Sequence, residues 1–322
     1  MNVRQSLVSR LVQQTEVCWT LKAPLLSNEG WRRFADGVVL FLAICWLSQI
    51  ASAQALSTLG WPETEVRLSR QLSGDTEQKR SALYEIRNYQ TEQASRLAIP
   101  ALTDPNAMIR ATAASSIVFL RESEAAALLR PLLDDKTEFV RREAAYALGE
   151  TRTRIATSAL VKLMLEDKVL EVRAAAAAAL GKTGDVSAVE SLTAILKKKP
   201  REGDEFLRRS AARSIGQIAQ IMRTGKPGVL TPQNFLPDKY KDTAVNTSIA
   251  VRSSSFATAV TILAQVLQNK NESDDTRREA AYALGAIGDR TATSVLQAHR
   301  NSSDPYLAEI CREALLKIEK SE

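Results

Sequence analysis

The sequence predicts an all-α protein, a right-handed α-solenoid in which antiparallel helix pairs stack into a superhelix. Three observations support this prediction: a phrase that occurs twice, an arginine that recurs at a regular interval, and apolar residues at helical spacing. The phrase VRREAAYALGE at residues 140–150 returns as TRREAAYALGA at residues 276–286. A duplicated active site or a repeated packing unit would explain this repetition, and the other two observations favour the packing unit.

The recurrent arginine begins a series of related, alanine-rich segments. It stands at positions 110, 141, 173, 208 and 277, so the intervals are 31, 32, 35 and 69 residues. The last interval equals about two periods, or one period plus an insertion. Residues 79–89 and 307–318 are expected to be weaker copies at the two ends. A period of this length is typical of a repeat array.

Each period contains two patterns that are typical of helices. The first is an apolar stripe, as in residues 123–133, 155–165 and 186–196. The second starts at the arginine and has alanine on nearly every side, so we expect it to be an inner helix pressed between its neighbours. One pair cannot bury its apolar face alone, but stacked pairs form a continuous core.

The inner helices are expected to end at a glycine in the left-handed conformation, which closes a helix without steric strain. Tyr146 and Tyr282, at equivalent places in the twin phrases, are expected to pack within the stack. Glu143 and Glu279 are expected to be glutamates of the first helical turn. The glycines concerned are Gly149, Gly181 and Gly285.

The turns between the helices share an aspartate six residues before the arginine. Such an acidic residue can cap the free N–H groups of a helix. An arginine at this offset can also reach the aspartate of its own repeat or of the next. A row of arginines that binds an anionic partner is one hypothesis, and a structural Asp–Arg ladder is the one we favour. The pairs are Asp104 and Arg110, Asp135 and Arg141, and Asp167 and Arg173.

The period, the D-x-x-x-x-V-R turn and the R-x-A-A-x-A-L-G helix resemble HEAT repeats, in particular the E-Z or phycobilisome-lyase-like type. The resemblance covers roughly residues 74–320 and implies a fold more than a function. Deoxyhypusine hydroxylase, a relative, holds two irons with His-Glu motifs. This sequence has no His-Glu pair, so that activity is not expected. A phycobilisome-lyase-like accessory or chaperone role is the alternative function that the resemblance implies.

The repeat pattern breaks once, at RTGKPGVLTPQNFLPDKYKDTAVNTS, residues 223–248. We expect residues 223–252 to be an inserted loop, because long insertions in a regular array lie on one face and often bind partners. A disordered or passively packed loop that binds no partner is the equal alternative. The candidate partner-binding residues are Lys226, Phe235, Lys239, Tyr240 and Lys241.

The N-terminal segment has the order of an export signal. Arg32 and Arg33 precede an apolar core at residues 38–50, and Ala51, Ser52 and Ala53 follow it. We expect residues 1–53 to be a signal peptide, or alternatively a membrane anchor that extends to residue 59. The chain is therefore expected to be exported, periplasmic or envelope-associated, or else membrane-anchored. Residues 54–73 are expected to be a linker or cap.

The sequence offers little from which to build a catalytic or metal site. It contains one histidine, His299, and neither a phosphate-binding glycine loop nor a nucleophile elbow. The net charge of +6 is modest and the aromatic content is 5%, so we expect no nucleic-acid partner. We expect no cofactor, no metal and no enzymatic activity.

The domain organisation follows from these observations. Residues 74–222 are expected to form repeats, and residues 253–322 are expected to form further repeats and a C-terminal cap. The expected function is a non-catalytic protein-binding scaffold or adaptor of a bacterial cell envelope. Its partner is expected to be another protein, bound along a concave face or through the inserted loop. Membrane contact is expected only through residues 37–59, if they stay uncleaved.

Overall fold

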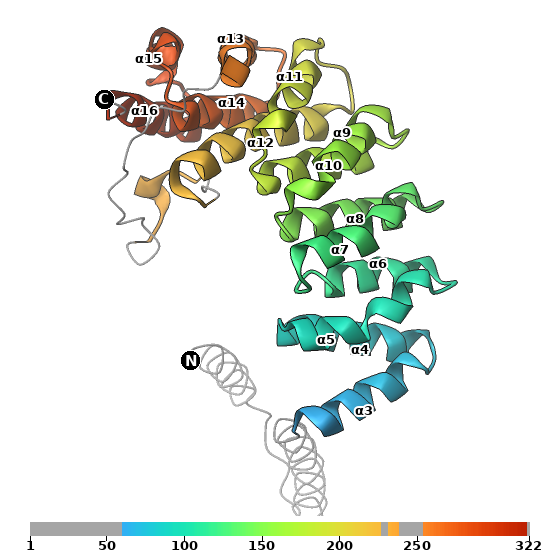
Figure 1. Ribbon diagram of the computed structural model, residues 1–322. Helices are drawn as coiled ribbons and strands as arrows, with labels where there is room; N and C mark the ends of the chain where they lie inside the picture. The colour runs from blue at the N-terminus through green and yellow to red at the C-terminus, as the bar shows by residue number, and fades with distance from the viewer. Residues whose placement is uncertain (1–59, 227–230, 238–253, 321–322) are drawn as a thin grey trace, which may run out of the picture. The chain divides into compact units, whose positions relative to one another are not determined.

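The computed structural model describes residues 60–226, 231–237 and 254–320 (Figure 1). The chain divides into two compact units, residues 1–63 and residues 64–322, and the repeats lie in the second. The expected signal or anchor segment, residues 1–53, lies outside the described residues. Within the described ranges every regular element is a helix, and none of these helices is long and apolar enough to cross a membrane.

The helices alternate between a first and a second member of each pair. The first members are α3 (Trp61–Leu72), α5 (Glu92–Leu97) with η1 (Ile99–Thr103), α7 (Glu122–Leu129) with η2 (Arg130–Asp134), α9 (Thr157–Glu166), α11 (Val189–Lys197), α13 (Ser254–Gln268) and α15 (Thr293–His299). The second members are α4 (Thr76–Tyr89), α6 (Ala107–Ser116), α8 (Glu138–Glu150), α10 (Leu170–Thr183), α12 (Glu205–Thr224), α14 (Asp274–Ile287) and α16 (Pro305–Glu319). Single 3₁₀ turns precede α9, α11 and α15, namely η3 (Arg154–Ala156), η4 (Val186–Ala188) and η7 (Arg290–Ala292).

The second helices pack on one another in order, from α4 to α16, and we call them the inner helices (Figure 1). The inner helices from α6 to α16 also pack on the first helices of their own pairs, as α10 does on α9 and α14 does on α13. Alanine makes this close packing of helices feasible, and Ala144, Ala176 and Ala280 have no exposed surface. The predicted fold class, an α-solenoid of antiparallel helix pairs, is confirmed for the described residues.

Proline breaks two of the first helices into an α-helix and a 3₁₀ helix. Pro100 and Pro131 stand at the start of η1 and η2, where a missing backbone N–H costs no hydrogen bond. Each 3₁₀ helix ends at an aspartate, Asp104 or Asp135, whose backbone N–H still bonds to a carbonyl within that helix. These turns therefore place both aspartates between a first helix and an inner helix.

The prediction for the terminal glycines is wrong. Gly181 and Gly285 lie inside their helices, and the left-handed caps come later, at Gly184 (φ 65°) and Gly288 (φ 77°). Gly149 also lies inside its helix, which is capped by Thr151 in the right-handed conformation. A Cβ atom on Gly149 would lie 2.9 Å from the Cα atom of Ala179 in the next inner helix. The helical glycines therefore permit close approach between successive inner helices, and they share this role. They are Gly149, Gly181, Gly216 and Gly285.

The interval of 69 residues is one period plus an insertion. Helix α14 packs directly on α12, and a Cβ atom on Gly216 would lie 2.7 Å from the ring of Tyr282. Helix α12 continues to Thr224, beyond the expected start of the loop, and α13 begins at Ser254. Helix α3 fills most of the segment 54–73 that was expected to be a linker or cap.

Candidate protein-binding surface

Every inner helix from α4 to α14 has a cation at the same place in the repeat, which we call the ladder position. This place lies at the junction between one repeat and the next, as the hydrogen bonds of the arginines show. The ladder cations are Lys79, Arg110, Arg141, Arg173, Arg208 and Arg277.

Two of the arginines bind the aspartate of the following repeat. Arg110 donates from Nε and Nη2 to the carboxylate of Asp135, at 2.8 and 2.9 Å. Arg141 does the same to Asp167, at 2.7 and 3.0 Å. Nη1 of Arg110 also donates to the backbone carbonyl of Asp104 in its own turn. It also donates to the carbonyl of Pro105, and Nη1 of Arg141 donates to the carbonyl of Asp135. Each guanidinium therefore joins two repeats, through a bidentate pair with the next repeat and carbonyl bonds within its own turn.

The electrostatics of these pairs favour the charged state of both partners. Burial disfavours the carboxylate of Asp135, but bonds from Arg110 and from the backbone N–H of Thr137 outweigh it, so the pKa of Asp135 is lowered. Asp167 has a lowered pKa for the same reasons, with Arg141 as its cation. Hydrogen bonds to the carboxylates raise the pKa of both arginines.

Arg173 differs from the other expected ladder arginines. Its Nε donates to the carbonyl of Met164, at 2.7 Å, and the described residues contain no carboxylate paired with it. The residue that directly follows α9 is Asp167, whereas the residue that directly follows α11 is Lys198. The structure therefore does not bring Arg173 and an aspartate together.

Further pairs lie along the same junctions, and sequence reasoning missed them. Lys79 bonds to Asp104, at 2.7 Å. Near the C-terminal end Asp304 is bound by Arg278, at 2.7 Å, and not by its neighbour Arg277. The signal for Lys79 was its separation of 25 residues from Asp104, which equals the separation of Arg110 from Asp135.

The most buried pair spans the insertion. Arg208 donates to the carboxylate of Glu272, and both side chains are only 2% exposed. The same guanidinium bonds to the carbonyls of Leu196 and Lys198 at the end of α11. The two partners stand 64 residues apart in the chain, so the regular spacing could not reveal Glu272. This pair joins the repeats on the two sides of the insertion.

The side of each inner helix that faces away from the first helices forms what we call the inner surface. The third and seventh residues after the ladder position are fully buried against the first helices, as are Ala144 and Leu148 in α8. At 100° per residue, the fifth residue points the opposite way. The fifth residues are Tyr84, Ser115, Tyr146, Ala178, Arg213 and Tyr282.

The twin tyrosines have different environments. Tyr282 is only 5% exposed and lies against Gly216, because α12 is 20 residues long and runs alongside it. Tyr146 is 40% exposed, since its neighbour α6 ends at Ser116 after 10 residues. The prediction that both rings pack within the stack is therefore wrong for Tyr146.

The twin glutamates also differ. Glu279 is fully buried, and its Oε1 lies 2.6 Å from Nη2 of Arg213 and 3.7 Å from Nε of Arg209. Burial raises the pKa of Glu279, and the two arginines oppose that effect. Glu143 is half-buried beside Arg142. Both glutamates lie in the second turn of their helices, so the expected first-turn position is wrong.

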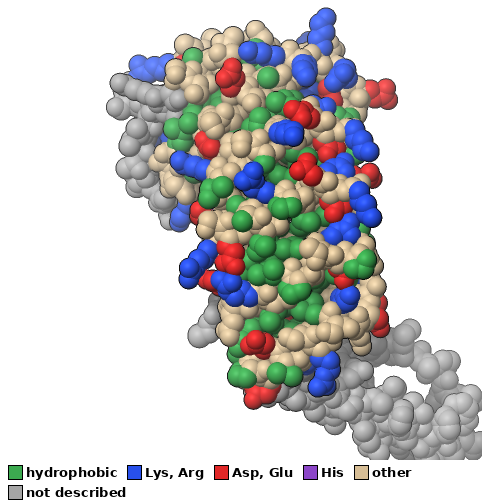
Figure 2. Space-filling model, turned by 45° about the vertical axis from the view of Figure 1, so that its right-hand side comes forward, with side chains coloured by type: hydrophobic (Ala, Val, Ile, Leu, Met, Phe, Trp, Pro, Cys, Tyr) green, Lys and Arg blue, Asp and Glu red, His purple; other side chains and the backbone are tan. Residues whose placement is uncertain are grey.

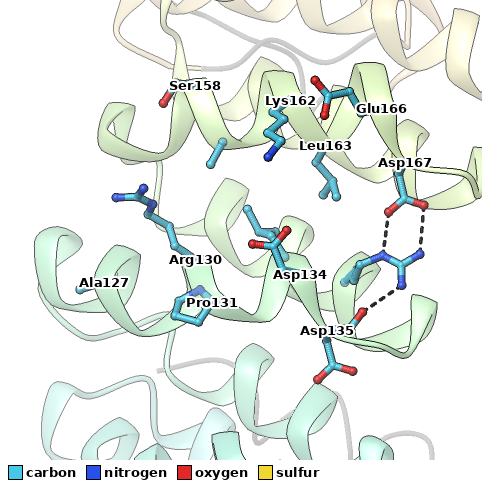
Figure 3. A pocket seen from close by; sticks show the side chains of 13 residues that line it. Ala127, Arg130, Pro131, Asp134, Asp135, Ser158, Lys162, Leu163, Glu166 and Asp167 are labelled. Atoms are coloured by element: carbon cyan, nitrogen blue, oxygen red, sulfur yellow. Dashed lines mark hydrogen bonds and ion pairs between the residues drawn. The ribbon is translucent and has the colours of Figure 1, made fainter.

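A groove of about 1080 Å³ lies between η2 and α9, on the side of the first helices (Figure 3). Leu133 and Leu163 contribute apolar surface to it, and Arg141 with its aspartates closes one end. Lys162 and Asp134 point toward one another from opposite walls (Figure 3). Charges of both signs are mixed here, so the groove does not favour one class of ion.

The insertion contributes two of its five candidate residues to the described structure. Lys226 is exposed, just after the left-handed cap at Gly225. Phe235, in the short helix η5 (Gln233–Phe235), contacts the ring of Tyr306 edge-on, at 5.0 Å between centroids. The remaining three, Lys239, Tyr240 and Lys241, lie outside the described residues.

The chemistry of the remaining candidate groups is limited. Nδ1 of His299 lies 2.9 Å from the carbonyl of Val295, one turn earlier in α15. Burial raises the pKa of the Cys311 thiol to about 12, which suppresses its thiolate. Over the described ranges, no three His, Cys, Asp or Glu side chains are grouped so that they could hold a metal ion.

The comparison with known families decides the classification. The model for HEAT repeats matches residues 65–149, 138–216 and 235–316, which is more than half of the chain. The chain belongs to the HEAT-repeat family. A comparison with curated proteins gives no match.

Solved structures similar to this HEAT-repeat chain include natural and designed proteins. Human deoxyhypusine hydroxylase in complex with glycerol is 19% identical, with 81% of this chain and 99% of that chain covered and a TM-score of 0.35. The complex of CpcE and CpcF of phycocyanin lyase from Nostoc sp. PCC7120 is 20% identical, with 79% and 87% covered and a TM-score of 0.44. A designed armadillo repeat protein is 17% identical, with 78% and 98% covered and a TM-score of 0.44.

Proposed function

We propose that this protein is a non-catalytic scaffold or adaptor that binds another protein along its inner surface. One observation carries the proposal: the rings of Tyr84 and Tyr146 are 50% and 40% exposed at equivalent places on α4 and α8. Ser115 of α6 occupies the same place between them, and its short side chain leaves room between the two rings. Half-exposed tyrosines at fixed spacing on a rigid array are suited to bind a protein segment.

The charges on the inner surface support a protein partner over a nucleic acid. Its cations are largely neutralised by carboxylates, as Arg213 is by Glu279 and Arg278 is by Asp304. A nucleic-acid site would need a concentration of uncompensated cations. On the face that Figure 2 shows, hydrophobic side chains run in a band along the repeats, with charged side chains on both sides.

The test is affinity capture with matched variants. We expect Tyr84→Ala/Tyr146→Ala to lower capture of the partner at least tenfold, because aromatic anchors dominate most protein interfaces. Ile155→Ala is the control, since this exposed apolar residue lies in η3, away from the inner surface. Equal capture by both variants would contradict the proposal, as would turnover of a substrate by the chain alone. Co-purification of a coloured ligand would favour the phycobilisome-lyase-like alternative.

The location that we propose is the cell envelope of a bacterium. Its support is the sequence of residues 1–53, in which a basic flank, a short apolar core and Ala51-Ser52-Ala53 follow in order. Sequencing the N-terminus of the mature protein tests this. A new N-terminus at Gln54 indicates export with cleavage, an uncleaved exported chain indicates an anchor at residues 37–59, and a chain in the cytoplasm contradicts the proposal.

A further inference from the structure

Residues 231–237, with the sequence TPQNFLP, form the described core of the insertion. Pro232 is buried, and its carbonyl accepts a bond from the backbone N–H of Phe235 at 2.9 Å, which closes η5. The segment lies across α14 and α16 from α13 and α15, that is, on the inner-surface side of the last repeats (Figure 1). It therefore covers the inner surface in the last repeats. Tyr84 and Tyr146 lie on the same surface in earlier repeats.

Two side chains of this segment bind α16. The amide Nδ2 of Asn234 donates to Oε1 of Glu309. The ring of Phe235 meets the ring of Tyr306 at an interplanar angle of 67°. The guanidinium of Arg278 lies 5.5 Å from the centroid of the Tyr306 ring and is itself held by Asp304.

The receiving site on α16 is held in place without the segment. The carboxylate of Glu309 is also bound by Arg312, at 2.8 Å, and Arg278 is fixed by its ion pair with Asp304. The site therefore presents the carboxylate of Glu309 as a hydrogen-bond acceptor beside the ring of Tyr306, and the guanidinium of Arg278 lies near that ring. Such a pair suits a segment with a donor side chain followed directly by an aromatic residue.

The described residues of the segment make few direct contacts with α16. Its described contacts with α16 are one hydrogen bond and one aromatic pair, and Phe235 stays 46% exposed. The covalent connection of the segment to the repeats compensates for these few contacts, because a tethered segment has an effective concentration on the order of millimolar at its site. A free segment must therefore bind through further contacts, or be present at comparable concentration, to replace it.

We propose that residues 231–237 are a self-ligand of the inner surface, which a partner segment carrying a hydrogen-bond donor followed by an aromatic residue must displace. This inference rests on the proposed function, since it names the chemistry of the partner and one control on its binding. The contact between the segment and α16 is thus an intramolecular competitor for the C-terminal part of the inner surface.

The test needs no partner, so its outcome is separate from that of the proposed function. The full-length variant Asn234→Ala/Phe235→Ala vacates the site, and a fluorescein-labelled TPQNFLP peptide is titrated while fluorescence polarisation is recorded. We expect the peptide to bind the vacated chain at least tenfold more tightly than the native chain, because the tethered segment competes in the latter. Adding Tyr306→Ala to the vacated chain is expected to weaken binding about tenfold.

Two matched controls accompany this titration. The peptide TPQNALP lacks the aromatic ring and is expected to bind weakly, whatever the variant. Phe206→Ala removes another exposed ring, on α12, and is expected to bind the peptide as the native chain does. Equal affinity of TPQNFLP for the native and vacated chains would overturn the proposal. So would absence of binding up to about 1 mM, or equal binding of the two peptides.

Discussion

At the scale of single residues, ion pairs join neighbouring repeats. These pairs lie at equivalent positions in the repeats but are buried to different extents. Arg110 and Asp135 keep a small part of their side chains in contact with solvent, whereas Arg208 and Glu272 are almost completely enclosed. A buried ion pair stabilises little over an apolar pair, but either partner left alone is costly. The pair across the insertion is therefore the most sensitive single contact in the stack.

Glu272→Ala is expected to lower the free energy of unfolding by about 3–5 kcal/mol, because it leaves the Arg208 guanidinium buried without its carboxylate. Urea denaturation followed by circular dichroism measures the change. Glu77→Ala in the exposed pair with Arg80 is the matched control, with an expected loss of about 0–1 kcal/mol. A loss for Glu272→Ala no larger than that of the control would show that Arg208 is not buried as described.

The ladder aspartates predict a dependence of stability on pH. The pKa of Asp135 is lower in the folded chain than its unfolded value of about 3.9, so its stabilising contribution is complete above that value and is lost as the pH falls below it. Asp135→Asn is expected to cost about 1–3 kcal/mol at pH 7 and progressively less below about pH 4. Urea titrations of both chains between pH 7 and pH 3 test this.

Asp134→Asn is the control for the pH series, since Asp134 is the exposed neighbour of Asp135. It is expected to change the free energy of unfolding by less than about 0.5 kcal/mol at pH 7. A constant difference between the native chain and Asp135→Asn across the whole pH range would contradict the role given to the Arg110 pair.

At the scale of elements, the distance between inner helices is set by glycines within them. A Cβ atom on Gly285 would lie 2.6 Å from the Cβ and 2.7 Å from the Cα of Ala314, and a backbone atom cannot move aside easily. In an isolated helix, alanine would be favoured over glycine. The close approach of α14 and α16 reverses that preference.

Gly285→Ala is expected to destabilise the protein by about 1–3 kcal/mol, since the cost of overpacking exceeds the gain in helix propensity. Thermal or urea denaturation measures the change. Ser115→Ala is the control, because Ser115 lies on the inner surface and its hydroxyl donates within its own helix, to the carbonyl of Thr112. It is expected to shift stability by less than about 0.5 kcal/mol. A stabilised Gly285→Ala chain would show that α14 and α16 lie further apart.

The sequence predicted the helix pairs well, but it did not predict what surrounds individual side chains. Period and alanine pattern predicted the helix pairs, because both reflect local packing that recurs in each repeat. The glycines of the inner helices were predicted to be helix caps, because spacing alone does not distinguish the end of a helix from a close contact between two helices. The unequal burial of Tyr146 and Tyr282 depends on the length of the neighbouring helix, which the twin phrases do not contain.

At the scale of the whole repeat unit, the insertion interrupts the chain without interrupting the stack. Helices α12 and α14 pack directly, and Arg208 with Glu272 closes the junction between them. The interval of 69 residues left two alternatives open, and only contacts between distant residues could decide between them. The candidate site was predicted in part: the insertion was singled out, but its attachment to α16 through Tyr306 and Glu309 was not.

The central claim is that the inner surface binds the protein partner. Nitration of tyrosine with tetranitromethane, mapped by mass spectrometry with and without the captured partner, tests it most directly. In the free chain Tyr84 and Tyr146 are expected to react and Tyr282 to stay protected, according to their exposure. The partner is expected to protect Tyr84 and Tyr146 together. Unchanged reaction of both tyrosines in the complex would contradict the claim.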